Sequence, residues 1–122
     1  MDALLRLVLA YARTEVAVGD GVTPFGASMA VDGELETASG ADPDEVRGIF
    51  RTRAERDELV AVAVCTGVVL GEPAFTDAIR VEIEHRDDEP ITFVLPYRVD
   101  EGRERPEWGE LTAGPGERRT WT

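Results

Sequence analysis

The stretch DAIRVEIEHRDDEPITFVLPYRV, residues 77–99, decides the fold of this chain. Apolar and charged side chains alternate on both sides of a turn, RDDEP, at 86–90. Two alternating runs joined by a turn predict an antiparallel hairpin with one buried face. The expected buried face consists of Ile79, Val81, Ile83 and His85 before the turn and Ile91, Phe93, Leu95 and Tyr97 after it.

One register keeps this face continuous across the hairpin. It places His85 opposite Ile91 and Ile79 opposite Tyr97, so that each apolar side chain meets another. Pro96 has no backbone N–H to donate, which predicts an edge position or the end of pairing. In this arrangement His85, the only histidine of the chain, completes the buried stripe.

Apolar spacing predicts two helices. The first covers 2–16 and has a wide apolar face. The second covers 41–57 and opens with a capping box, in which Asp42 is the N-cap, Pro43 follows it and Glu45 reaches back. The expected buried positions are Leu4, Leu7, Val8 and Tyr11, with Leu5, Leu9, Ala12 and Val16 beside them, in the first helix, and Val46, Ile49, Phe50 and Ala54 in the second, whose arginines at 47, 51, 53 and 56 lie mostly outside this stripe.

Two further strand regions precede the long hairpin. The run FGASMAVDGELETAS, 25–39, contains the Asp-Gly dipeptide of a tight hairpin, with Val31 opposite either Glu34 or Leu35. The valine-rich run LVAVAVCTGVVL, 59–70, predicts a strand inside a sheet. Its face of mostly small residues suits a closely packed helix or second subunit, and consists of Leu59, Ala61, Ala63, Cys65 and Gly67.

The resulting order of elements is α-β-β-α-β-β-β. This order favours an α+β two-layer sandwich, in which an antiparallel sheet of about five strands carries helices on one face. The order resembles that of roadblock and profilin-like folds. The length of 122 residues suits one domain with its own core. We expect residues 1–98 to form this domain, and residues 99–122 to form an irregular tail that wraps the domain or is partly disordered.

The composition limits the classes of function. A formal net charge of −12 opposes binding to nucleic acid and to anionic membranes. A single cysteine excludes an internal disulfide and a multi-cysteine metal site. The chain starts with an acid, Asp2, where a signal peptide carries positive charge, and no apolar run is long enough to span a membrane. We therefore expect a complete cytoplasmic protein without cofactors.

The chain offers few residues for catalysis. A general base at His85 would need a nucleophile and an orienting carboxylate within reach, and the stripe explains this histidine more simply. Cys65 lies in a valine-rich strand, where a thiol behaves as a small hydrophobe. Ser28 lacks the second glycine of a nucleophile elbow. The acidic residues of both hairpins suit solvated turns, so we predict no catalytic residue and no metal ligand.

The outer face of the long hairpin carries charges of alternating sign. Such a face usually provides solubility, but it is also a surface that a partner can contact. The small-residue face of 59–70 is a second surface of this kind. The candidate binding residues are His85, Arg80, Tyr97, Arg98 and Trp108.

Two segments carry a resemblance to known proteins. PFGASMAVDGE at 24–34 and DAIRVEIEHRDDEPITFVLPYRV at 77–99 resemble the two hairpins of a group of small uncharacterised bacterial proteins. That group has no assigned activity, so the resemblance implies a fold and a small cytoplasmic bacterial protein, and it implies no catalytic residues. Within the shared pattern, Gly26 is expected to allow a close backbone approach and Pro96 to end a strand.

These observations favour a non-enzymatic domain that binds protein, as a homodimer formed through an exposed face or edge of the sheet. A first alternative is an acidic inhibitor or immunity-type partner of a basic protein, because complementary charge speeds association. A second alternative is a small-molecule binder or weak hydrolase with His85 and Tyr97 at the mouth of a pocket.

Overall fold

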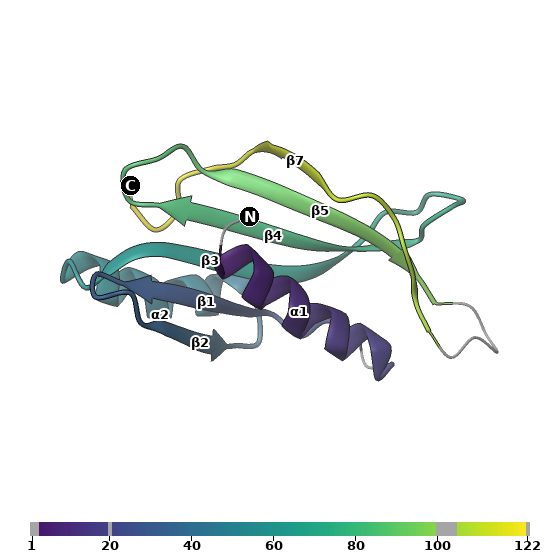
Figure 1. Cartoon of the computed structure of the whole chain (residues 1–122), viewed down its shortest axis with the longest axis horizontal. Helices are drawn as coiled ribbons and strands as arrows, with labels where there is room; N and C mark the ends of the chain where they lie inside the picture. Colours follow the sequence, from purple (N-terminus) through teal and green to yellow (C-terminus); the bar gives the residue numbers. More distant parts are fainter. Residues whose placement is uncertain (1–2, 20, 100–104, 122) are drawn as a thin grey trace.

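The computed structural model describes residues 3–19, 21–99 and 105–121. Within these residues the chain forms two helices and one seven-stranded antiparallel sheet (Figure 1). The α+β class and the predicted order of elements are confirmed, and the sheet has two strands more than expected. The elements are α1 (Ala3–Ala17), β1 (Phe25–Ala30), β2 (Leu35–Ser39), α2 (Pro43–Glu55), β3 (Leu59–Val69), β4 (Asp77–His85), β5 (Ile91–Arg98), β6 (Glu107–Trp108) and β7 (Thr112–Pro115).

The sheet has the strand order β2-β1-β3-β4-β5-β6, and β7 also pairs with β5. The predicted β4–β5 hairpin is present, but its register differs by two residues, since Ile91 lies opposite Ile83 rather than His85. His85 instead pairs with Ala61 on β3, and the next residue, Arg86, donates its backbone N–H to a β3 carbonyl. A shift of two keeps each residue on its predicted face of the sheet. Ile91, which was expected in the buried stripe, is nevertheless 39% exposed.

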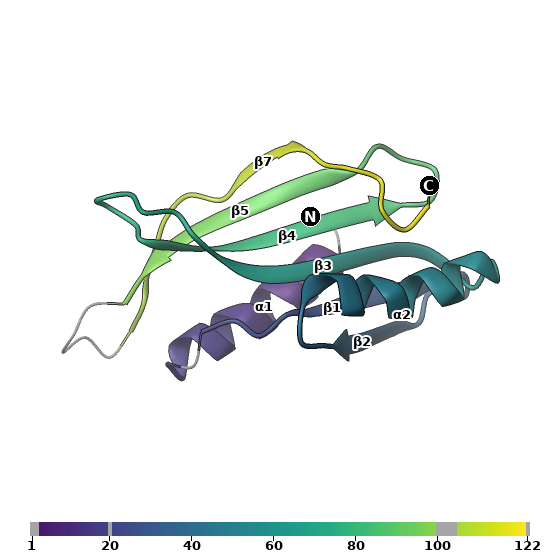
Figure 2. The same ribbon diagram turned by 180° about the vertical axis from the view of Figure 1, so that it is seen from behind.

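The two helices lie on opposite faces of the sheet, which corrects the expectation of helices on one face (Figures 1 and 2). Strand β3 explains the difference, because side chains alternate between the two faces of a strand. Ala61, Ala63 and Cys65 pack under α1, whereas Val62 and Val64 pack under α2. The middle of the small-residue face is therefore covered by a helix, one of the two covers expected for it, whereas Leu59 belongs to the α2 cluster and Gly67 is exposed.

Close packing is equally marked on the α2 face. A Cβ atom at Gly26 would lie 2.5 Å from the Ala63 carbonyl oxygen and 2.7 Å from the Phe50 ring. Both distances are far below van der Waals contact, so only glycine lets α2 sit this close to β1. The expected close approach at Gly26 is confirmed.

Helix α2 begins with the predicted N-cap, and Glu45 reaches back to the residue before the cap rather than to Asp42 itself. The Asp42 side chain accepts the Glu45 backbone N–H at 2.9 Å, and the Glu45 carboxylate accepts the N–H of Ala41. Two predictions about its surface are wrong, however. Ile49, expected in the buried stripe, is 44% exposed, whereas Arg47, expected outside it, is only 6% exposed.

Helix α1 buries most of its predicted stripe, with one exception. Tyr11 was expected in the core but is 53% exposed. Its ring lies against that of Phe25, with 4.7 Å between the ring centroids. Tyr11 therefore covers the outer margin of the apolar layer.

The β1–β2 hairpin adopts neither of the two registers left open by its sequence. Met29 pairs with Leu35, so that Val31 lies in the turn and not in the ladder. The Val31 backbone N–H donates to the Glu58 carbonyl, and the Glu34 N–H donates to the Asp32 side chain. These bonds hold the turn and leave the Val31 side chain exposed.

The region after residue 98 was expected to be an irregular tail, but its described part extends the sheet. Strand β6 pairs Trp108 with Tyr97, and β7 pairs Gly114 with Thr92. The Arg118 side chain then donates to the backbone carbonyls of His85 and Asp88. The chain thereby covers its own β5 edge.

Candidate functional site

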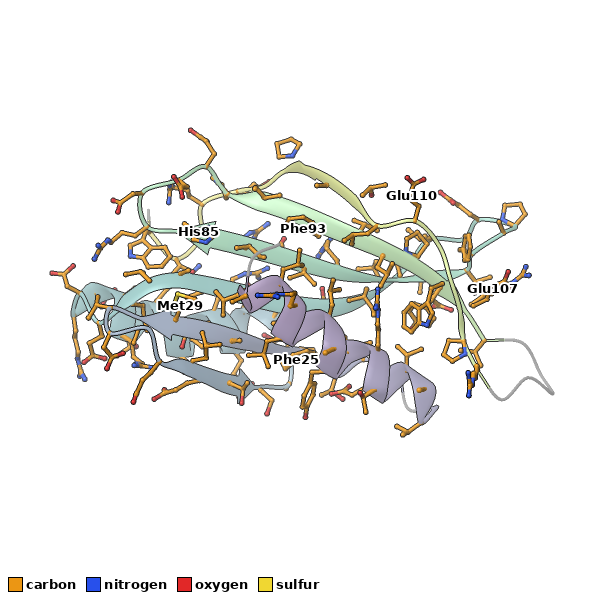
Figure 3. All side chains as sticks on the ribbon, in the orientation of Figure 1. Phe25, Met29, His85, Phe93, Glu107 and Glu110 are labelled. Carbon is orange, nitrogen blue, oxygen red and sulfur yellow. The ribbon has the colours of Figure 1, made fainter. Side chains whose placement is uncertain are left out.

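The five residues singled out from the sequence do not form one cluster. His85 is the last residue of β4 and lies opposite Ala61 of β3. Tyr97 of β5 lies opposite Asp77, which is the first residue of β4. Figure 3 shows His85 and Glu107 at opposite ends of the long hairpin. The pocket mouth proposed for His85 and Tyr97 is therefore not assembled in this structure.

Tyr97 and Trp108 do come together. Their ring centroids are 5.5 Å apart with an interplanar angle of 48°, and both rings belong to the apolar layer that contains α1. Arg98 pairs with Glu107 at 2.5 Å. Arg80 lies elsewhere, on the α2 face of β4 beside Glu82.

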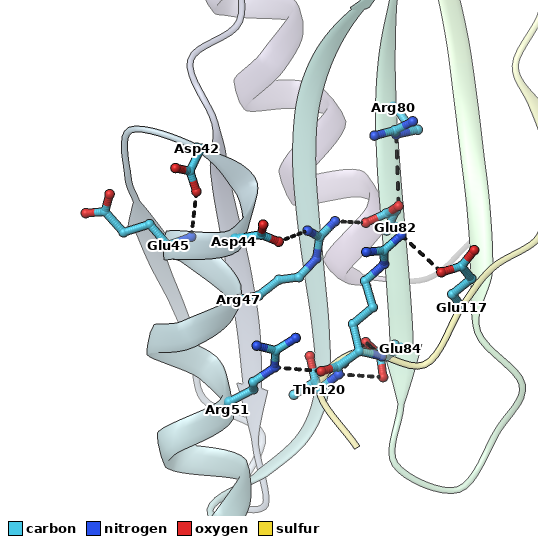
Figure 4. A network of polar contacts seen from close by, with 11 residues as sticks. Asp42, Asp44, Glu45, Arg47, Arg51, Arg80, Glu82, Glu84, Glu117 and Thr120 are labelled. Carbon is cyan, nitrogen blue, oxygen red and sulfur yellow. Dashed lines mark hydrogen bonds and ion pairs between the residues drawn. The ribbon is translucent and has the colours of Figure 1, made fainter. Parts of the chain in front are cut away.

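A charged network of Asp44, Arg47, Arg80 and Glu82 joins α2 to β4 (Figure 4). The buried guanidinium of Arg47 donates to Asp44 at 2.8 Å and to the carboxylate of Glu82. Arg80 Nε lies 4.0 Å from Glu82. Because α2 supplies the cation for an acidic residue of β4, this network fixes the helix to the sheet.

Next to this network, Glu84 holds the C-terminal segment, which we define as residues 117–121. Glu84 is 5% exposed, and its carboxylate accepts the backbone N–H groups of Arg119 at 3.0 Å and Thr120 at 2.9 Å. Arg51 of α2 donates to the Arg119 carbonyl at 2.7 Å (Figure 4). The alternating charges of β4, considered above as a surface for a partner, are thus contacted by the chain's own helix and C-terminal segment.

Strand β2 presents a different kind of surface, because it pairs only with β1 within the described residues. The Ala30 N–H donates to Glu34, and the Gly40 N–H donates to Pro24. In an antiparallel pair, hydrogen-bonded and non-hydrogen-bonded positions alternate. The two bonds show that Glu34 and Gly40 are hydrogen-bonded positions, so the backbone groups of Leu35, Thr37 and Ser39 between them point away from β1. These outward-pointing groups form a free edge.

Sequence reasoning could not locate this free edge. The hairpin was visible in the sequence, but the outward direction of a backbone group depends on register, and neither register considered was the observed one. The features of the sequence that could have indicated an edge strand are the short length of β2 and its mixture of apolar and polar residues.

Burial determines the chemistry of the two perturbed side chains. Desolvation, with a smaller contribution from Glu15, raises the pKa of Cys65 from 9.0 to about 12. The thiol therefore stays protonated near neutral pH and is a poor nucleophile. Burial, followed by the charge of Asp77, also raises the pKa of Tyr97.

The described residues contain neither a metal-binding cluster nor a helix that could span a membrane. No cluster of three or more His, Cys, Asp or Glu residues is arranged to hold a metal ion in this part of the chain. No helix among these residues is long and apolar enough to cross a membrane.

The comparisons with known proteins add no further assignment. No protein-family model, curated protein or solved structure matches the chain.

Proposed function

We propose that this chain is a non-enzymatic protein-binding domain that forms a homodimer through the free edge of β2. The observation that carries the proposal is the outward direction of the backbone groups at Leu35, Thr37 and Ser39. An exposed edge strand is a template for pairing with another strand, and edges are commonly protected by proline, charge or a covering segment. The β5 edge is covered in this way by β6 and β7, whereas β2 is not covered by described residues.

A second copy fits this edge in one favourable register. If two β2 strands pair antiparallel around a twofold axis at Thr37, Leu35 of each copy lies opposite Ser39 of the other. All three outward-pointing residues then find partners, and the interface is the same surface on both copies. Glu36 lies opposite Ala38 of the second copy, so no like charges face each other directly.

The net charge separates this proposal from the acidic-inhibitor alternative. Two copies of charge −12 repel each other, so added salt should strengthen a homodimer by screening the repulsion. A complex with a basic protein should instead weaken as salt rises. Salt dependence therefore distinguishes the two kinds of partner.

The test is sedimentation equilibrium of the whole chain and two Thr37 variants, at several protein and salt concentrations. Thr37→Pro removes an outward N–H that β1 does not use, and proline is tolerated at such an edge position. Thr37→Val keeps the N–H and is the matched control. We expect the unchanged chain and Thr37→Val to be dimers, and Thr37→Pro to be a monomer with an unchanged circular dichroism spectrum.

A second variant tests the proposal if Thr37→Pro fails to fold. Thr37→Glu keeps every backbone group but places two carboxylates opposite each other at the axis, which should weaken the dimer. A chain that stays monomeric at every concentration, or variants that dimerise as well as the unchanged chain, would overturn the proposal.

A further inference from the structure

An open pocket of about 560 Å³ lies between the end of α1 and the start of β6. Arg13 and Thr14 of α1 line one side, and Arg105 and Trp108 line the other. The volume lies within the range of small-molecule sites, roughly 300–1,000 Å³. The pocket involves neither β2 nor His85.

Charge makes this pocket unusual in an acidic protein. The chain has 25 acidic and 13 basic residues, and several arginines elsewhere in the described residues pair with carboxylates, as in the Arg47–Glu82 and Arg98–Glu107 pairs. Within the described residues, no ion pair joins Arg13 or Arg105 to a carboxylate. Two guanidinium groups from distant parts of the sequence thus line one cavity, and no acid among the described residues forms an ion pair with either of them.

Arg13 is held in place by an aromatic ring. Its guanidinium lies 5.5 Å from the centroid of the Trp108 ring, within the range of a cation–π interaction. Trp108 is in turn packed against Tyr97. The stacked guanidinium is therefore positioned in advance, and its donors are in a fixed fork that suits a carboxylate or phosphate.

The C-terminal end of α1 offsets the positive charge of the two arginines only in part. Carbonyl groups at the C-terminus of a helix carry partial negative charge, which disfavours an anion. Here the Thr14 carbonyl accepts the Val18 N–H, and the Val16 carbonyl accepts the Gly19 N–H. Engagement of these two carbonyls reduces their repulsion of an anion, and the two arginines supply positive charge to the pocket lining.

We propose that this pocket binds a small organic anion, a carboxylate or phosphate monoester with an apolar body, between Arg13 and Arg105. The apolar body contacts Ala17, Val18 and Pro106, which line the same cavity. The anionic group contacts the two guanidinium groups. This binding activity is independent of the proposed β2 dimer, so each proposal fails separately.

The experiment uses Trp108 as the reporter. The chain has two tryptophans, so Trp121→Phe leaves Trp108 as the only one. The probes are phenyl phosphate, phenylacetate, inorganic phosphate and benzyl alcohol, titrated against tryptophan fluorescence. Isothermal titration calorimetry on the unchanged chain repeats the measurement without any substitution.

We expect saturable binding of phenyl phosphate or phenylacetate, weaker binding of inorganic phosphate and no binding of benzyl alcohol. Arg13→Gln and Arg105→Gln should each lower the affinity for the aromatic anion about tenfold, because each removes a charge-assisted hydrogen bond. Arg56→Gln is the control, since it makes the same change of charge at an exposed position at the end of α2.

Two results would overturn the proposal. One is the absence of saturable binding by both aromatic anions in calorimetry, and the other is equal weakening by Arg56→Gln and the two pocket variants. Inorganic phosphate binding as tightly as phenyl phosphate would remove the assigned role of the apolar lining and overturn the ligand class.

Discussion

The two faces of the sheet are packed by different means. The α1 face is apolar, with small residues of β3 beneath a helix that buries leucines and valines. The α2 face combines a smaller apolar cluster around Phe50 with the charged network and the Glu84 contacts. The difference shows that alternating charges on a strand do not always mark a solvent face, because another part of the same chain can supply their partners.

The strongest test of this contrast is a deletion in the apolar face. Ile79 is fully buried there, and Ile79→Ala should lower the free energy of unfolding by about 4 kcal/mol through lost burial and the cavity left behind. Denaturant unfolding at neutral pH measures this loss. Ile49→Ala makes the same chemical change at the exposed α2 position and should cost less than about 1 kcal/mol. Equal losses would contradict the assignment of the two positions.

The polar face is tested next by Glu84→Gln. A neutral amide accepts the backbone N–H groups of Arg119 and Thr120 more weakly, and we expect a loss of about 2 kcal/mol. Trp121 packs on the α2 cluster, so release of the C-terminal segment should shift its fluorescence to longer wavelength. Glu117→Gln, which removes only an exposed ion pair with Arg119, is the control and should have almost no effect.

The smallest expected effect concerns pH and the apolar face. The folded chain favours protonated Cys65, because its pKa rises from 9.0 to about 12. This contribution to stability is fully present below pH 9 and is lost as the pH rises toward 12. The loss amounts to ~1.4 kcal/mol by pH 10. The free energy of unfolding should therefore fall more steeply from pH 8 to 10 in the unchanged chain than in Cys65→Ala. Parallel pH profiles would show that the thiol is not desolvated.

Local patterns in the sequence predicted the elements well, because each rests on interactions between neighbours. The capping box at Asp42 and the alternation of 77–99 are of this kind. The prediction that both helices cover one face of the sheet was wrong, since β3 is apolar on both faces and either face accepts a helix. Arg47 was misassigned for a related reason, because its acidic partner Glu82 is 35 residues away and becomes a neighbour only after folding.

The candidate site was harder to predict from the sequence than the fold, for the same physical reason. Tyr97 and Trp108 were both singled out and do meet, but Arg13 and Arg105 were not recognised as a pair. Nothing local in the sequence links residues so far apart. Their association depends on β6 returning along β5 to reach the end of α1, and the pairing of 107–108 with 97–98 was not expected.

The position of β3 has a consequence for the dynamics of the chain. Its amides are hydrogen-bonded between β1 and β4, and a helix covers each of its faces. No local opening exposes such a strand, so the slowest hydrogen exchange should occur at residues 61–65 and report global unfolding. Exchange should become faster outward in both directions, through β4 and β5 on one side and through β1 to β2 on the other. The strand proposed to pair with a second copy is therefore also the one whose protection should rise most on association.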